Sequence, residues 1–289
     1  MKNARPLPSY LVQRYHGWKA TTFAENHIWY RRLAEDGQRP RAMIVSCCDS
    51  RVHVTSIFGA DSGEFFIHRN IANLIPPYKP DGDLHGTSAA VEYAVTALKV
   101  AHLIVIGHSQ CGGVAGCHAM CSGKAPELEE KSSFVGRWMD LLRPGYEKVA
   151  DMTDDALAIR ALEHEAVKIS LSNLMTFPFV REKVEADEMT LHGLWTDIGE
   201  GGLSQYIPEI DACEPILADR LLRTELNTGL PFCGRLSFTA VLSGVFRSLL
   251  WSAMRRRALA IAVSCRGMVC PGVKVRRGLM SGPHSRRTR

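Results

Sequence analysis

Several features are missing from this chain of 289 residues, and each absence narrows the class of protein. No run of about 18 uncharged apolar residues occurs, so we expect no membrane-spanning helix. Residues 1–19 mix basic and aromatic residues without the apolar core of a secretory signal. The nine cysteines include no C-x-x-C pair, which argues against a thioredoxin-like motif and favours metal ligation over a disulfide framework. We therefore expect a cytoplasmic protein.

The charge is distributed unevenly along the chain. Residues 1–211 contain 21 Lys and Arg against 27 Asp and Glu, whereas residues 212–289 contain 14 against 3. We predict one folded domain over 1–211 and a basic, poorly ordered C-terminal extension over 212–289. Because the positive charge lies in the extension alone, the pI of 8.7 is weak evidence for a nucleic-acid partner, and we expect neither nucleic acid nor membrane as a partner. A tether to either one, and a non-native extension, stay open as alternatives for this segment.

Hydrophobic patterns predict alternating strands and helices. Short apolar runs predict strands at 41–47, 63–70 and 102–108. Helical spacing predicts helices at 8–36 with a break near Gly17, at 85–100, from 111 onward and at 154–176. Strand, helix and strand in this order favour a parallel unit with a right-handed crossover. We predict an α/β fold with a central, mostly parallel sheet flanked by helices, an N-terminal helical arm and a C-terminal strand hairpin over 190–210.

Two clusters of chemically active residues follow predicted strands. The first reads CCDSR from Cys47 to Arg51, and the second reads HSQCGG from His108 to Gly113. Ligands of open α/β sheets bind at the carboxyl ends of the strands, so Cys47, His108 and Cys111 can converge on one ion. Three protein ligands with a fourth position left for water are typical of catalytic zinc, and thiolates with imidazole favour zinc over magnesium. One such cluster alone would more often be core packing, but two at equivalent strand ends favour a metal site.

Asp49 and Arg51 add a second layer to this site. A carboxylate two residues from a ligand cysteine could close the metal site, and a bidentate arginine is suited to hold it away. Asp49 then stays ionised and faces the fourth position as a hydrogen-bond acceptor.

With HRNIAN at 68–73, these clusters resemble the β-class carbonic anhydrases, closely over about 38–114 and loosely across 1–211. The resemblance implies a catalytic domain over 1–211, one Zn²⁺ per subunit on Cys47, His108 and Cys111, and an active cleft at the interface of a homodimer or higher even oligomer. It also implies Asp49 and Arg51 as the catalytic pair. The sequences at 75–78 and 89–95 resemble the plant-like subgroup, whose zinc keeps its water.

The substrate pocket of that subgroup is lined by residues that match Gln38, Phe66, Ile71, Tyr93 and Gly112 here. Apolar side chains suit CO₂, and the Gln38 amide and the Gly112 N–H could donate hydrogen bonds to the charged product. We expect a carbonate dehydratase, a lyase that reversibly hydrates CO₂ to bicarbonate and a proton by zinc-bound hydroxide. Hydrolysis of carbonyl sulfide or carbon disulfide on the same scaffold and a non-catalytic zinc-binding module are the alternatives.

Overall fold

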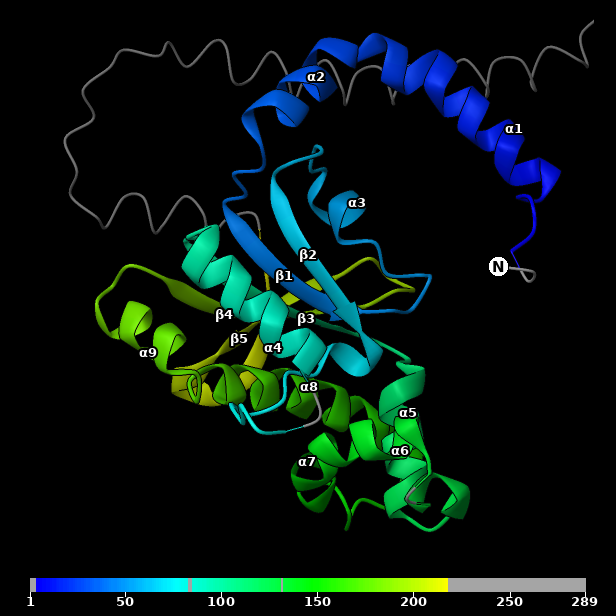
Figure 1. The fold of residues 1–289 in the computed structure, drawn as a ribbon. Coiled ribbons are helices and arrows are strands. Elements are labelled where there is room, and N and C mark those ends of the chain that lie inside the picture. The colour runs from blue at the N-terminus through cyan, green and yellow to red at the C-terminus, as the bar shows by residue number, and fades with distance from the viewer. Residues whose placement is uncertain (1–3, 83–84, 131, 218–289) are drawn as a thin grey trace, which may run out of the picture. The chain divides into compact units, whose positions relative to one another are not determined.

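A central sheet organises the computed structural model, which describes residues 4–82, 85–130 and 132–217 (Figure 1). The described strands form one six-stranded sheet in the order β2-β1-β3-β4-β5-β6. Their bounds are β1 Ala42–Cys47, β2 Phe65–Asn70, β3 His102–His108, β4 Thr190–Thr196, β5 Leu203–Ile207 and β6 Ala212–Pro215. The first four strands are parallel, and β5 and β6 are antiparallel to their neighbours. The predicted α/β fold with a mostly parallel sheet and a terminal hairpin is confirmed.

Helices flank this sheet and form the N-terminal arm. The arm comprises α1 Ser9–Trp18, the π-helical turn η1 Lys19–Phe23 and α2 His27–Asp36. The other α-helices are α3 Val54–Phe58, α4 His85–Glu92, α5 Gly112–Cys121, α6 Phe134–Met139, α7 Arg143–Glu147, α8 Asp155–Leu174 and α9 Pro178–Glu185. Short helical turns lie at η2 Ile71–Asn73, η3 Tyr93–Ala97, η4 Pro126–Glu129, η5 Asp140–Leu142 and η6 Pro208–Ile210. No described helix is long and apolar enough to cross a bilayer.

The hydrophobic core has one part between the sheet and the helices α4, α8 and α9 and a second part between α8 and α5. Helix α8 thus belongs to both parts. This helix begins at Asp154, whose carboxylate accepts hydrogen bonds from the backbone N–H groups of Ala156 and Leu157. It packs against β3 and β4, where two glycines allow a close approach. A Cβ at Gly107 would lie 2.8 Å from a methyl group of Val167, so a side chain there would push the helix away. The glycine thus brings α8 near the carboxyl end of β3.

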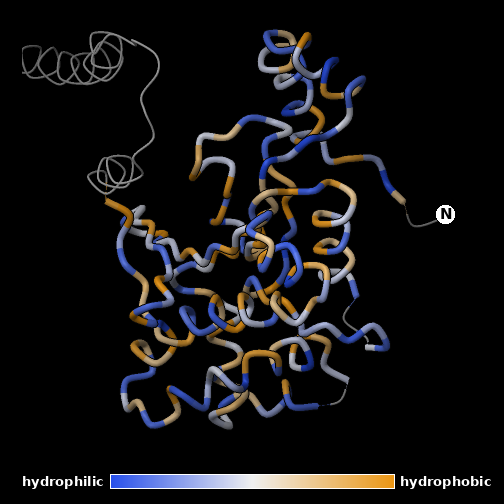
Figure 2. Tube along the Cα trace, turned by 90° about the vertical axis from the view of Figure 1, so that its left-hand side faces the viewer, coloured by the Kyte–Doolittle hydropathy of each residue, from blue (hydrophilic) through white to orange (hydrophobic). Residues whose placement is uncertain are grey.

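The arm contributes no buried residue to this core. Aromatic residues of the arm contact one another instead, with Phe23 and Tyr30 stacked at 5.3 Å between ring centroids. Tyr10, Trp18 and Trp29 are all exposed, and the apolar residues of the arm are visible as orange stretches in Figure 2. An arm of this composition leaves apolar surface available to a partner.

The C-terminal segment begins inside the sheet. Strand β6 pairs with β5 and follows Asp211, so the sheet includes four residues of the segment that the charge pattern assigned to the extension. Residues 218–289, which hold most of that basic extension, lie outside the described residues. Its predicted poor order therefore stays a prediction.

Candidate metal centre

Three potential metal ligands meet at the carboxyl end of the sheet. Cys47 and His108 are the last residues of the adjacent parallel strands β1 and β3, and Cys111 immediately precedes α5. All three are buried, and their ligand atoms lie within 4.8 Å of one another. The two sulfur atoms are 3.9 Å apart, close to the roughly 3.8 Å expected for two zinc–sulfur bonds at a tetrahedral angle. The strand ends therefore bring together the three residues that the sequence singles out.

The chemistry of His108 fits a metal at this position. Its ring is 1 % exposed, and its Nδ1 lies 2.9 Å from the carbonyl oxygen of Ser109, so Nδ1–H donates to that carbonyl. The lone pair is then on Nε2, which is buried and has no hydrogen-bond partner among the described residues. A buried acceptor without a partner costs about 1–3 kcal/mol, so this atom needs a ligand. A zinc ion shared with the two sulfurs supplies one.

The Sγ atoms of Cys47 and Cys111 lie within hydrogen-bond distance of each other. A hydrogen bond between the sulfur atoms lowers the pKa of Cys47 and raises the pKa of Cys111, because one thiol donates to the thiolate of the other. Two sulfurs poised in this way, with an imidazole lone pair beside them, match the ligand preference of zinc.

Asp49 and Arg51 form a two-point ion pair beside these ligands. Arg51 Nε lies 2.9 Å from Oδ1 of Asp49, and Arg51 Nη2 lies 2.6 Å from Oδ2. The same Nη2 donates to the carbonyl of Gln110 at 2.9 Å, which fixes the guanidinium against the second cluster. These hydrogen bonds hold the pKa of Asp49 well below its ordinary value, so the carboxylate is ionised at neutral pH.

Arg69 and Glu163 support the site, although neither was a candidate from the sequence. Arg69 donates to the carbonyls of Cys47 at 2.9 Å and Asp49 at 2.7 Å, which ties β2 to the loop after β1. Glu163 on α8 is 3 % exposed and accepts the backbone N–H of Cys111 at 3.0 Å. Arg69 lies within the HRNIAN stretch, which was a usable signal. Glu163 lies in an amphipathic helix with no local sign of its role.

The five expected pocket residues divide into two groups within one chain. Gly112 directly follows Cys111 in the chain. Ile71 packs against the neighbouring Gly113, where a Cβ would lie only 2.6 Å from a methyl group of Ile71. Both therefore lie beside the metal ligands.

Phe66, Tyr93 and Gln38 form the second group, away from the ligands. The rings of Phe66 and Tyr93 contact each other at 5.8 Å. Phe66 is level with Met43, four residues before Cys47, which corresponds to about 13 Å along the sheet. Gln38 is exposed and precedes β1, at the opposite end of that strand from Cys47. The second group thus does not reach the metal cluster of its own chain.

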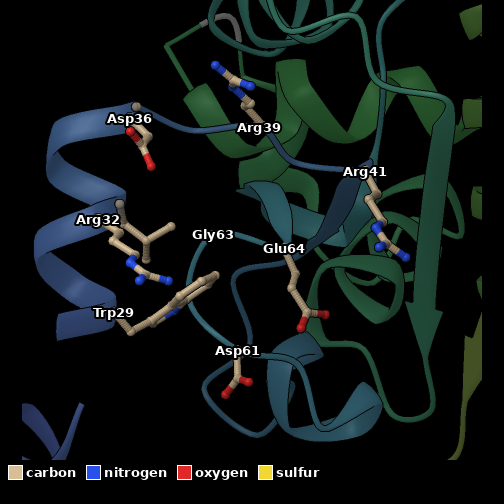
Figure 3. Close-up of a pocket in the computed structure, with 10 residues that line it drawn as sticks. Trp29, Arg32, Asp36, Arg39, Arg41, Asp61, Gly63 and Glu64 are labelled. Atoms are coloured by element: carbon tan, nitrogen blue, oxygen red, sulfur yellow. The ribbon is translucent and has the colours of Figure 1, made fainter. Parts of the chain in front are cut away.

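A separate cavity of about 610 Å³ lies between α2 and the loop before β2 (Figure 3). Side chains of both charges line this cavity, with the basic residues Arg32, Arg39 and Arg41 and the acidic residues Asp36, Asp61 and Glu64. Arg41 directly precedes β1, so this cavity is at the opposite end of that strand from Cys47. It is therefore not part of the metal centre.

Comparison with known proteins identifies relatives of this chain. The family profile "Carbonic anhydrase" matches residues 42–203. "Beta carbonic anhydrase 3" of Arabidopsis thaliana is 37% identical over 188 residues, which cover 64% of this chain and 70% of that protein.

Solved structures give the same result. The β-carbonic anhydrase CcaA superposes on this chain with a TM-score of 0.66 at 28% sequence identity. The match covers 73% of this chain and 92% of the CcaA chain. The enzyme CafA of Aspergillus fumigatus gives a TM-score of 0.59 at 29% identity over 75% of this chain and 96% of its own. A tetrameric enzyme of Sordaria macrospora gives a TM-score of 0.57 at 29% identity, with coverages of 68% and 95%. The profile spans more than half of the chain and ends beyond both ligand clusters, and on these grounds the chain belongs to the β-class carbonic anhydrases.

Proposed function

We propose that this protein is a carbonate dehydratase that reversibly hydrates CO₂ to bicarbonate and a proton, with one zinc ion on Cys47, His108 and Cys111. The observation that carries the assignment is the buried, unpaired Nε2 of His108 beside two sulfurs 3.9 Å apart. Zinc held by two thiolates and one imidazole lowers the pKa of a coordinated water and so supplies the nucleophile.

Asp49 keeps the fourth position open to solvent. Its two oxygens already accept hydrogen bonds from Arg51, and the carbonyl of Gln110 prevents the guanidinium from rotating away. The ionised carboxylate can then accept a hydrogen bond from the attacking water and orient its lone pair toward CO₂. This arrangement supports the plant-like, open-site form of the enzyme. Asp49 and Arg51 are the catalytic pair of this proposal.

The substrate pocket is completed in a homodimer. Ile71 and Gly112 lie beside the metal ligands, whereas Phe66, Tyr93 and Gln38 do not reach the ligands of their own chain. In the single chain Ile71 is 37% exposed and Tyr93 49% exposed, which leaves apolar surface on both groups. A two-fold dimer in which each copy supplies Phe66, Tyr93 and Gln38 to the other's cleft would bury both groups. The tetrameric relative of Sordaria macrospora supports an even oligomer.

Two further features of the protein are part of the proposal. None of the six described cysteines is in a disulfide bond, which supports a reducing compartment such as the cytoplasm. The catalytic residues of the proposal lie in 1–211, and the folded domain extends past Asp211 because Ala212–Pro215 form β6; the remainder of 212–289 is the basic extension.

The test is zinc content together with the CO₂ hydration rate in Cys47→Ser, with Cys48→Ser as the matched control. Cys48 is the neighbouring thiol but is exposed and is not part of the cluster. We expect Cys47→Ser to lose both zinc and rate and Cys48→Ser to keep both. After dialysis to one zinc per chain in the wild type, the same zinc content in Cys47→Ser would contradict the ligand set. Sulfide released from carbonyl sulfide without CO₂ hydration would assign a different substrate to the site.

A further inference from the structure

A second cluster of metal-binding groups lies at the amino ends of β3 and β4, the opposite end of the strands from Cys47 and His108. His102 is the first residue of β3 and Thr190 the first residue of β4, and the parallel register pairs the two. His192 lies two residues after Thr190 and therefore projects on the same face of the sheet. His108 is six residues after His102 on β3, or about 20 Å away along the strand, so this cluster is separate from the proposed catalytic centre.

Three donor atoms converge in this cluster. His102 Nδ1 lies 2.7 Å from Thr190 Oγ1, Thr190 Oγ1 lies 2.8 Å from His192 Nε2, and the two ring nitrogens are 3.4 Å apart. Two zinc–nitrogen bonds of about 2.0–2.1 Å at a tetrahedral angle require nitrogens roughly 3.4 Å apart. The two ring nitrogens thus already have the separation that chelation needs, whereas the hydroxyl oxygen, at 2.7 and 2.8 Å from them, is at hydrogen-bond distance.

The hydroxyl of Thr190 holds the two imidazoles together. It can donate to one ring nitrogen and accept from the N–H of the other ring, which fits the two short contacts. A cation bound between the ring nitrogens would accept a lone pair from each imidazole. Burial lowers the pKa of His192, and the neighbouring His102 lowers it further, so the ring is neutral and able to act as a ligand at pH 7.

We propose that His102 and His192, held in place by Thr190, form a second binding site for a divalent transition-metal ion, with Zn²⁺ as the reference ion. Two imidazoles favour zinc, nickel or copper over magnesium and calcium. His102 is exposed and His192 half-buried, so the site is open to the surface and water completes the coordination. The ion links β3 to β4, strands that are distant in sequence, and it binds only where the sheet has formed. It therefore raises the thermal midpoint of unfolding.

The test measures the number of zinc ions per chain in the full chain already loaded at its tight site, after dialysis against micromolar free Zn²⁺. The variants are His102→Ala, His192→Ala and Thr190→Val. His53→Ala is the matched control, because Nδ1 of His53 contacts the hydroxyls of Thr55 at 2.7 Å and Ser56 at 3.2 Å rather than a second imidazole.

We expect two zinc ions in the wild type and in His53→Ala. Loss of either imidazole should weaken the second ion at least about 100-fold, and loss of the hydroxyl about tenfold. All variants should keep the first ion and the CO₂ hydration rate, since none alters the catalytic site. One ion in the wild type, or two ions in both His102→Ala and His192→Ala, overturns the proposal.

A measurement on the unmodified protein distinguishes metal binding at this site from metal binding to free thiols. It does not require any variant to fold. Co²⁺ is added to the chain that holds zinc at its tight site alone, and the absorption of the newly bound ion is recorded. Imidazole and water ligands give weak visible bands alone, whereas thiolate ligands add an intense near-ultraviolet charge-transfer band. Saturable binding with the weak visible bands alone supports the proposal, and the charge-transfer band contradicts it.

Discussion

Replacing Arg51 by lysine separates the role of Asp49 from that of the metal ligands. Arg51 binds both oxygens of Asp49 and the carbonyl of Gln110 through a rigid planar group. Lysine keeps the charge but makes single-point contacts, so at least one charge-assisted hydrogen bond to Asp49 is lost. The carboxylate is then free to turn toward the metal, and the fourth position is no longer reserved for water.

The magnitude follows from the number and exposure of these bonds. A charge-assisted hydrogen bond contributes about 1.5–3 kcal/mol. The Arg51 side chain is 45% exposed and that of Asp49 16%, so solvent screening favours the lower end of this range. Since about 1.4 kcal/mol corresponds to a tenfold change in rate, we expect kcat/KM for CO₂ hydration to fall roughly 10- to 30-fold.

The assay is stopped-flow CO₂ hydration with zinc content determined on the same samples. Zinc content should be unchanged, because the side-chain hydrogen bonds of Arg51 go to Asp49 and to the carbonyl of Gln110, and the three ligands are intact. Arg143→Lys is the control: this arginine also binds two carboxylates, Asp140 at 2.6 Å and Glu129 at 2.8 Å, but belongs to neither cluster. A full rate in Arg51→Lys, or loss of its zinc, would refute the role assigned to the pair.

Three further predictions test the support of the site. Gly113→Ala places a Cβ 2.6 Å from Ile71 and 3.2 Å from Ala72, and we expect the free energy of unfolding in urea to fall by about 1–3 kcal/mol; an unchanged midpoint would show that this contact relaxes freely. Glu163→Leu leaves the buried N–H of Cys111 without an acceptor and should cost about 1–3 kcal/mol, whereas Glu163→Gln keeps an acceptor and should cost less; equal losses in the two variants would argue against this hydrogen bond as the cause. Truncation after Asp211 removes β6 and bares the edge of β5, so light scattering should detect association that truncation after Leu217 does not produce.

Local sequence patterns were sufficient to predict the metal ligands as a group. The apolar run that ends at Cys47 and the one that ends at His108 both mark strand ends, and parallel pairing brings such ends together. The Asp49–Arg51 contact spans only two residues, so it too depends on local chain geometry. These features could be predicted from the sequence because they require only that two neighbouring strands exist.

Features that depend on the register between distant parts of the chain could not be predicted from the sequence. Glu163 reaches Cys111 only because α8 packs closely on the sheet, and nothing near it in sequence indicates that contact. His102 and His192 are 90 residues apart and meet through the β3–β4 register. The break in the N-terminal helix depends on local sequence alone: it was expected near Gly17, and α1 ends at Trp18, where the π-helical turn Lys19–Phe23 begins.

The coordination of zinc in the enzyme, measured by X-ray absorption at the zinc edge, tests the central claim most directly. In protein dialysed to one zinc per chain we expect two sulfur ligands at about 2.3 Å and two nitrogen or oxygen ligands at about 2.0–2.1 Å. Cys111→Ser should reduce the sulfur count from two to one in any zinc that it retains. A shell of three or four sulfurs, or one with no sulfur, would contradict a centre built from Cys47, His108 and Cys111 with its fourth position open to water.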